Sequence, residues 1–399
     1  MSNQPKSKSL VGWGLAAVVL IALVLAVGLP GLRGEPETQA STSTGAGQGT
    51  ASQGQQGASG TTVDDLLQSQ EQSKPQETAP MPSCWAEMQR LDKELTLDNY
   101  RTALSAAATG GDRYLLTYLQ ERLTRMVGND PQKALKVLSW AEETGEGVEL
   151  MVYMESLKKA PAVQNPKVSG RLLQLAENTK NPMPLRAATV IGLETQKSFD
   201  AATLTRMKAL ALDGSEEQVA WNATRTIGRV LEEDVKNGGN YKPYWEQLLD
   251  ISRKSEDRAV RGLALEMPTY SNLVLDEKSV PALSEIMRTE RDKEARELAA
   301  MRLSVTEVPE KALDAYRAAF PTETEFCVRW AMFRYALRAA GPAALPLAYQ
   351  FAQQEPRLMT TYLDFKAVYD QGTHDWERVF MEKGPTAHVE CMDDHSGGQ

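Results

Sequence analysis

Histidine is scarce in this sequence: its 399 residues include only His374, His388 and His395, all near the C-terminal end. Histidine is the commonest side-chain acid or base near neutral pH, so most of the chain lacks a histidine-based nucleophile system. The sequence also lacks a glycine-rich phosphate loop, a Gly-x-Ser-x-Gly elbow and a His-Glu-x-x-His helix. We therefore expect a protein that is not an enzyme and that uses no cofactor.

The sequence also has no excess of basic residues and few cysteines. Its 44 basic and 53 acidic side chains give a net charge of −9, which disfavours nucleic acid as a partner. The three cysteines are too few for a dense disulfide framework. Cys84 and Cys391 flank the folded region, and a bridge between them would require the two ends of an elongated domain to meet. Cys327 with Cys391 is therefore the better pair for a single bridge. Three free thiols remain the alternative.

One long apolar run stands out near the N-terminus. Residues 10–32 carry no charge and are long enough to cross a hydrocarbon core as a helix. They follow a short N-terminus, residues 1–9, with Lys6 and Lys8. The pattern predicts an uncleaved signal anchor that binds the chain to the membrane. A cleavable signal peptide is the alternative, but the run is longer than the usual apolar core of such peptides.

The bias of basic residues around this run predicts its orientation. Lys6 and Lys8 precede the run and only Arg33 follows it closely, which places the N-terminus in the cytoplasm and the rest outside. We expect a single-pass protein of a bacterial inner membrane, with its C-terminal domain in the periplasm. Residues 33–83 are rich in Gly, Ser, Gln and Pro and predict a disordered linker with a mean reach of about 40 Å.

The pattern of residues 84–385 predicts an all-α domain. Runs of alternating apolar and polar residues typical of strands are missing, and apolar residues recur every three or four positions instead. The most regular part, residues 168–305, repeats a helix, a polar turn and a second helix with an alanine four positions after a small or apolar residue. Its copies are Met183–Ala187, Val219–Ala223, Val260–Ala264 and Ala295–Ala299, whose alanines lie 36, 41 and 35 residues apart. This spacing is typical of stacked helix hairpins.

These copies resemble HEAT repeats, which belong to the armadillo-like α-solenoids. The resemblance rests on the apolar first helix, the polar turn, and the sequences from Val260-Arg261 to Ala264 and from Ala295-Arg296 to Ala299. Family members use the basic residue in a ladder between repeats, and by this alignment Pro184 and Ala220 replace it in the first two copies. The turns carry the expected N-cap residues Asn181, Ser215, Asp257 and Asp292.

Two groups of side chains are candidate binding residues. The second helices carry a basic stripe that would suit an acidic partner: Arg225, Arg229, Arg258, Arg261, Arg296 and Arg302. The alternative for this stripe is salt bridging between repeats, with Asp257, Asp292, Glu294 and Glu297. The tail, residues 386–399, holds the weak metal-ligand candidates His388, Cys391 and His395, with a flexible, unliganded tail as the alternative.

The sequence predicts a membrane-anchored scaffold that binds a protein partner without catalysis, and it leaves that partner unnamed. One alternative is a receptor for a small ligand, glycan or metal in the concave groove of the solenoid. The aromatic residues Trp221, Tyr241, Tyr244 and Trp245 support it, although core packing explains them more simply. A second alternative is an enzyme or enzyme subunit built on a HEAT-like scaffold.

Overall fold

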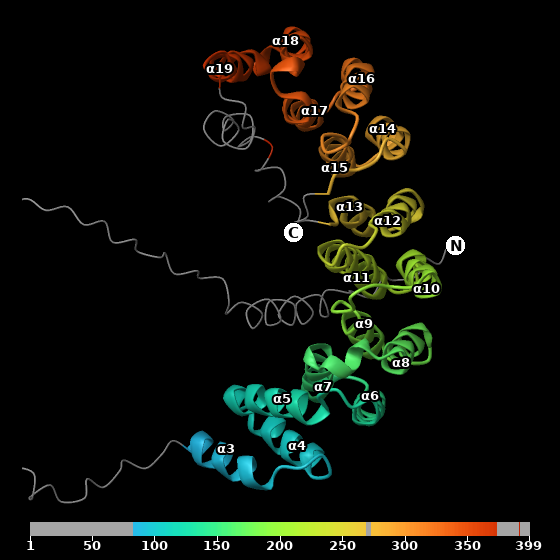
Figure 1. Ribbon diagram of the computed structural model, residues 1–399, viewed down its shortest axis with the longest axis vertical. Coiled ribbons are helices and arrows are strands. Elements are labelled where there is room, and N and C mark those ends of the chain that lie inside the picture. The colour runs from blue at the N-terminus through green and yellow to red at the C-terminus, as the bar shows by residue number, and fades with distance from the viewer. Residues whose placement is uncertain (1–82, 269–272, 373–390, 392–399) are drawn as a thin grey trace, which may run out of the picture. The chain divides into compact units, whose positions relative to one another are not determined.

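A computed structural model of the chain describes residues 83–268, 273–372 and 391. The described residues form an all-α domain of stacked consecutive helices, drawn in colour in Figure 1. Its first helices are α3 (Ser83–Glu94), α4 (Tyr100–Gly110), α5 (Arg113–Val127), α6 (Pro131–Thr144), α7 (Gly147–Lys159), α8 (Pro166–Glu177), α9 (Met183–Ile191) and α10 (Ala201–Leu212). They continue as α11 (Glu217–Lys236), α12 (Lys242–Lys254), α13 (Arg258–Glu266), α14 (Ser279–Thr289), α15 (Lys293–Leu303), α16 (Pro309–Ala319), α17 (Phe326–Ala340), α18 (Leu345–Gln354) and α19 (Met359–Asp370).

Several sequence predictions lie outside the described residues. These are the apolar run 10–32, the linker up to residue 82, and all of the tail 386–399 except Cys391. Within the described ranges, no helix combines the length and apolar character that a membrane crossing requires.

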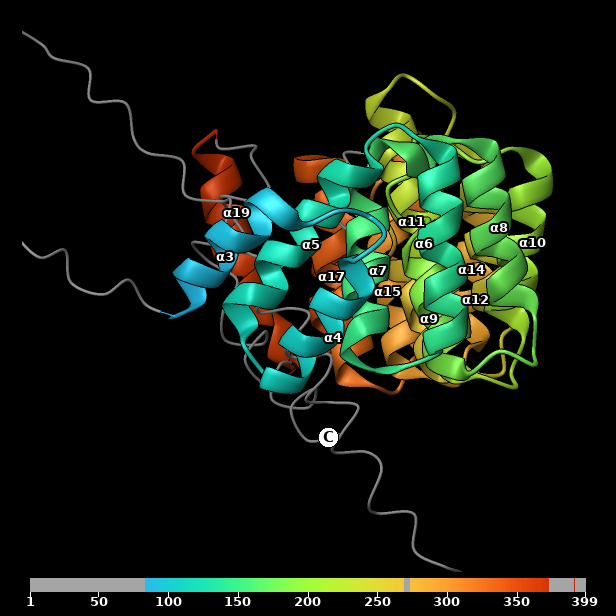
Figure 2. The same cartoon turned by 90° about the horizontal axis from the view of Figure 1, so that it is seen from below.

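The helices form two layers. Helices α7, α9, α11, α13, α15 and α17 pack in succession against one another and form the odd-numbered layer. Helices α6, α8, α10, α12, α14 and α16 form the even-numbered layer, and each hairpin joins one helix of each layer. The view in Figure 2 places α8, α10, α12 and α14 to the right of α7, α15 and α17. The predicted stack of helix hairpins is therefore present as a sequence of consecutively packed helices.

Apolar side chains fill the space between the layers along the whole stack. Near its start, Tyr100, Trp140 and Tyr153 join α4, α6 and α7, with ring centroids 5.9–6.5 Å apart. Near its end, Phe320 stacks on Phe351 with centroids 3.9 Å apart. Each of these five side chains is at most 6% exposed. Because every helix contributes to this shared core, each hairpin depends on its neighbours for stability.

The structure confirms two of the four predicted N-cap residues of the second helices. Asp257 accepts hydrogen bonds from the amides of the second and third residues of α13, and Asp292 accepts one from Glu294 of α15. The predictions for Asn181 and Ser215 are wrong. Asn181 instead donates to the carbonyl oxygen of Leu175, and the residue preceding α11 is Glu216, whose side chain makes no cap bond. A short polar residue in a turn caps a helix only where the turn places it directly before the first helical residue.

The register assigned to the first repeat copy is also wrong. In the later copies, Val219, Val260 and Ala295 are the third residues of their helices, but Met183 is the first residue of α9. The third residue of α9 is Leu185, which is fully buried like Val260. An apolar residue four positions before an alanine recurs by chance in a helix rich in apolar residues, and the match at Met183 placed the alignment two residues out of register.

Candidate functional site

With the register corrected, the predicted Arg261 occupies a helical position whose contacts recur in other hairpins. Arg261 is the fourth residue of α13, and its guanidinium donates to the carbonyl oxygens of Ser255 and Glu256 at 3.1 and 3.0 Å. These carbonyls follow the end of α12, the first helix of the same hairpin. The guanidinium also lies 3.5 Å from the carboxylate of Glu290, which caps the end of α14 in the next hairpin. Arg261 therefore joins two consecutive hairpins.

Arg296 repeats this arrangement one hairpin later. It is the fourth residue of α15, and it donates to the carbonyl oxygens of Glu290 and Arg291 at 2.9 and 3.1 Å. Two of its nitrogens also contact the carboxylate of Glu323 at 2.8 and 3.1 Å. The side chains of Arg296 and Glu323 are only 11% and 7% exposed, so this bidentate pair is shielded from solvent.

Two further arginines occupy the same position, although the sequence analysis did not predict them. Arg186 is the fourth residue of α9; it donates to the carbonyl oxygen of Ala176 at 2.8 Å and lies 3.7 Å from Asp213. Arg329 is the fourth residue of α17 and pairs with Glu355 at 3.2 Å. The expectation that the first copy lacks the basic residue is thus wrong, whereas Ala220 does occupy that position in α11. We call Arg186, Arg261, Arg296 and Arg329 the ladder arginines.

The other predicted arginines of α11 and α15 also make contacts within the domain. Arg225 lies 3.3 Å from Glu194, and Arg229 lies 3.0 Å from Glu232. Arg302 is buried and donates to carbonyl oxygens at the end of α13, among them that of Leu265 at 2.6 Å. Burial lowers the pKa of Arg302 to about 10, because a desolvated guanidinium loses the hydration that stabilises its charge. Arg302 is therefore placed to hold α13 against α15.

Arg258 differs from these side chains because it is largely exposed. It is the first residue of α13, and its guanidinium contacts Asp292 at 2.7 Å and Glu294 at 3.0 Å while its side chain stays 61% exposed. The salt bridging predicted with these two carboxylates is thus present. The Asp292 side chain is only 7% exposed, whereas that of Glu294 is 42% exposed, so only the pair with Glu294 is an exposed pair of the kind that contributes little to stability. The Arg258 guanidinium stays accessible to a competing ligand.

Arg258 lies at the edge of a hollow whose lining is mainly basic. The hollow has a volume of about 450 Å³, and we call it the basic hollow. Five cationic side chains and two carboxylates line it: Arg258, Arg261, Arg291, Lys293, Arg296, Asp292 and Glu325. Three of the six predicted arginines thus meet at one place, together with two cationic residues that the sequence prediction did not include.

Helix ends add to the positive potential of the basic hollow. Its lining includes the first residues of α13 and α15, Arg258 and Lys293, and the N-cap of α17, Glu325. The N-terminus of an α-helix carries a partial positive charge, which favours a nearby anion. Arg291 is exposed, and among the described residues no hydrogen bond or ion pair engages its guanidinium. The arrangement suits a ligand that carries several negative charges.

A second hollow, of about 620 Å³, lies between α4 and α7 near the start of the stack. Small polar and apolar side chains of α4 form one wall: Thr102, Ser105, Ala106 and Thr109. Arg101, Glu149 and Tyr153 complete its lining. With one basic and one acidic side chain, this α4–α7 hollow has no charge preference.

Three of the four aromatic residues proposed for a ligand groove have structural roles instead, whereas the fourth, Trp221, is 36% exposed and lies under the guanidinium of Arg225. Tyr244 and Trp245 are each 2% exposed; the Tyr244 hydroxyl accepts from the amide of Phe199, and the Trp245 indole donates to Ser279. Tyr241 accepts from the amide of Asp276. Core packing, the simpler explanation, therefore accounts for these three residues.

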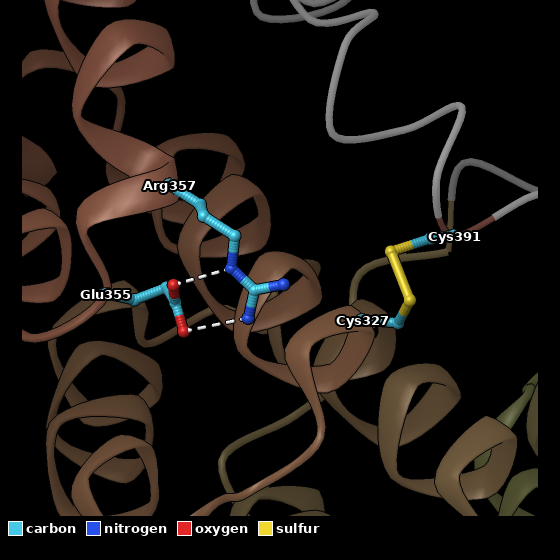
Figure 3. Close-up of a disulfide and its surroundings, with 4 residues drawn as sticks. All are labelled: Cys327, Glu355, Arg357 and Cys391. Carbon is cyan, nitrogen blue, oxygen red and sulfur yellow. Dashed lines mark hydrogen bonds and ion pairs between the residues drawn. A yellow bond between two sulfur atoms is a disulfide. The ribbon is translucent and has the colours of Figure 1, made fainter.

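The predicted cysteine pairing is confirmed. Cys327, the second residue of α17, forms a disulfide with Cys391, and their α-carbons lie 5.4 Å apart. Figure 3 shows this disulfide beside the Glu355–Arg357 ion pair. Cys84 is a free thiol. Such a bridge fits an oxidising compartment.

The disulfide also bears on the predicted metal ligands. Metal binding requires a thiolate, and the sulfur of Cys391 is bonded to Cys327 instead. The other two candidates, His388 and His395, lie outside the described residues. Within the described ranges, no group of His, Cys, Asp and Glu side chains is arranged to hold a metal ion.

Comparison of the chain with protein-family models, curated proteins and solved structures gave no match.

Proposed function

We propose that the helical domain is a HEAT-like scaffold that binds an acidic segment of a protein partner in the basic hollow, without catalysis. The hollow's five cationic side chains and three helix N-termini are the observation that carries this proposal. The ladder arginines support the HEAT-like assignment, because the resemblance gives a basic residue at this position a ladder role between repeats. An acidic protein segment fits better than a small neutral ligand, since it matches the charge of the lining.

The arginines that line the hollow have two different roles. Arg261 and Arg296 are held by backbone carbonyls and by the carboxylates of Glu290 and Glu323, so they form its fixed inner wall. Arg258 and Arg291 are exposed at its edge and can pair with an incoming carboxylate. Charge-assisted hydrogen bonds from guanidinium groups to carboxylates are stronger than neutral ones and recognise the planar carboxylate geometry.

Charge reversal at the hollow tests this proposal. Full-length protein in detergent is titrated against a fluorescent Glu-rich peptide, and the double variant Arg291→Glu with Lys293→Glu is compared with the wild type. Loss of two exposed charge pairs, each worth up to about 1 kcal/mol, lowers the affinity by at most about thirtyfold, and we expect a fall of about tenfold.

The matched control is Arg113→Glu with Lys133→Glu, which makes the same change in net charge at exposed positions of α5 and α6. We expect its affinity for the peptide to stay within about twofold of the wild type. Equal losses in the two double variants would assign binding to net charge alone and contradict a specific site.

We further propose that residues 10–32 anchor the domain to a bacterial inner membrane and that the domain lies in the periplasm. The apolar run and the basic residues before it support the anchor, and the Cys327–Cys391 disulfide fits that compartment. Fusions to the C-terminus test the topology: alkaline phosphatase should be active and a cytoplasm-dependent fluorescent protein dark. The reverse pattern would place the domain in the cytoplasm.

A further inference from the structure

The disulfide fixes the beginning of the C-terminal segment close to the basic hollow. Cys391 is buried at 5% exposure, and its α-carbon lies 5.4 Å from that of Cys327. Cys327 follows Glu325, a lining residue of the hollow, by two positions. Two peptide links span at most about 7.6 Å, so Cys391 lies within about 13 Å of Glu325 between α-carbons.

The residues after Cys391 are long enough to reach the hollow. Met392–Gln399 comprises eight residues, and an extended chain of that length spans about 26–29 Å. Asp393 and Asp394 are the second and third residues after Cys391, so their α-carbons can lie up to about 7–11 Å from it. The two carboxylates can therefore be delivered to the hollow without any change in the helices.

The charges of this segment complement those of the hollow. Asp393 and Asp394 are adjacent carboxylates, and five cationic and two acidic side chains line the hollow. Arg291 is the exposed cation among them whose guanidinium makes no hydrogen bond or ion pair within the described residues. We propose that residues Met392–Gln399 bind in the basic hollow through Asp393 and Asp394 and are held there by the Cys327–Cys391 disulfide. This inference builds on the proposed function, because the segment would then occupy the site that serves the acidic partner.

Such a segment competes with the partner at a high effective concentration. A ligand tethered by a short flexible linker is present at an effective concentration in the millimolar range. A partner in solution must displace it, so the segment lowers the apparent affinity of the hollow for acidic ligands. Reduction of the disulfide breaks the tether at α17, lengthens the chain that connects the segment to the helices, and weakens the competition.

Truncation of the full-length chain tests the inference. A chain that ends at Cys391 keeps the disulfide and loses both aspartates, and we expect it to bind the Glu-rich peptide about tenfold more tightly than the wild type. A chain that ends at His395 keeps both aspartates and serves as the matched control, with affinity unchanged. The full-length double variant Asp393→Asn with Asp394→Asn should match the chain that ends at Cys391. Cys391→Ser should give a smaller gain, because it removes only the tether.

A second titration separates this inference from the proposed function. A labelled peptide of the sequence Met392–Gln399 is added to the chain that ends at Cys391, with and without the substitutions Arg291→Glu and Lys293→Glu. We expect binding only where the hollow keeps its cationic residues. Binding of this peptide without binding of the Glu-rich peptide would contradict the proposed partner and support the inference. Equal affinity of the wild type and the chain that ends at Cys391 for the Glu-rich peptide would overturn the inference alone.

Discussion

The basic hollow and the α4–α7 hollow lie on the same kind of helical stack but differ in charge. The α4–α7 hollow lies along the flank of α4 and the start of α7, where Glu149 offsets Arg101. The basic hollow lies where α13, α15 and α17 all begin, so ladder arginines and helix N-termini meet there. The comparison shows that the start of an odd-numbered helix is not sufficient for a basic site: at α7 the acidic Glu149 offsets Arg101, whereas at α13, α15 and α17 three helix starts and two ladder arginines lie together.

The largest effect is expected from removal of a ladder arginine under the basic hollow. Arg296→Met leaves the carboxylate of Glu323, whose side chain is 7% exposed, without its bidentate partner. Breaking a buried ion pair by removing one partner costs about 3–5 kcal/mol, so we expect a large fall in the midpoint of thermal unfolding. Arg296→Lys should recover part of the loss, because it restores one charge. A midpoint equal to that of the wild type would show that the ladder does not hold the hairpins together.

A smaller effect on stability is expected when the pH is lowered. It arises at Glu355, the partner of Arg329, which is the last ladder arginine. The hydrogen bond from Arg357, followed by that from Arg329, lowers the pKa of Glu355 in the folded state. A lowered folded-state pKa stabilises the domain above the unfolded pKa of about 4.3, and this stability is lost as pH falls through the lower folded pKa.

Glu355→Gln isolates this contribution because the amide does not titrate. We expect the variant to be about 1 kcal/mol less stable at pH 7, and the difference from the wild type to shrink as pH falls below about 4. Denaturant unfolding across this pH range measures it. A difference that stays constant with pH would mean that the charge of Glu355, which pairs with both Arg357 and Arg329, contributes nothing to the stability of the domain.

The smallest effect is expected at the α4–α7 hollow. Arg101 pairs with Glu143 at 2.7 Å, but the two side chains are 45% and 58% exposed. Because surface pairs contribute about 0–1 kcal/mol, Arg101→Met should lower stability by less than Arg296→Met does. It should also leave the affinity for the Glu-rich peptide unchanged. A loss of affinity in this variant would move the binding site to the start of the stack.

The sequence predicted the helices well because their signals are local. The apolar spacing and the Asp130-Pro131 opening of α6 suffice to place that helix, and Asp130 accepts from the amides of Gln132 and Lys133. For the cysteines, the sequence favoured Cys327 with Cys391 over a bridge between the two ends of the folded region, but it left three free thiols as the alternative, because bridge formation depends on how close the helices place the two sulfurs. The register of the first repeat was not predictable, because Met183 and Ala187 match the repeat by composition while Leu185 occupies the buried third position of the helix.

The basic hollow itself was only partly predictable. Its lining comes from three separate segments, 258–261, 291–296 and residue 325, which the stacking of α13, α15 and α17 brings together. The sequence identified Arg258, Arg261 and Arg296 as basic residues of second helices, but it treated them as part of one continuous stripe. The distinction between arginines held by carbonyls and arginines exposed at the edge depends on where each hairpin ends, which the sequence pattern does not encode.

Hydrogen exchange of the chain that ends at Cys391, which leaves the hollow free of Met392–Gln399, tests most directly with and without the Glu-rich peptide whether the basic hollow is the binding site. The amides of residues 289–297 and 323–327 cover the turns that line the hollow, and the amides of residues 100–110 report on the α4–α7 hollow. We expect slower exchange in the first two segments and no change in the third when the peptide binds. Protection confined to residues 100–110, or absent from both hollows at saturating peptide, would contradict the account.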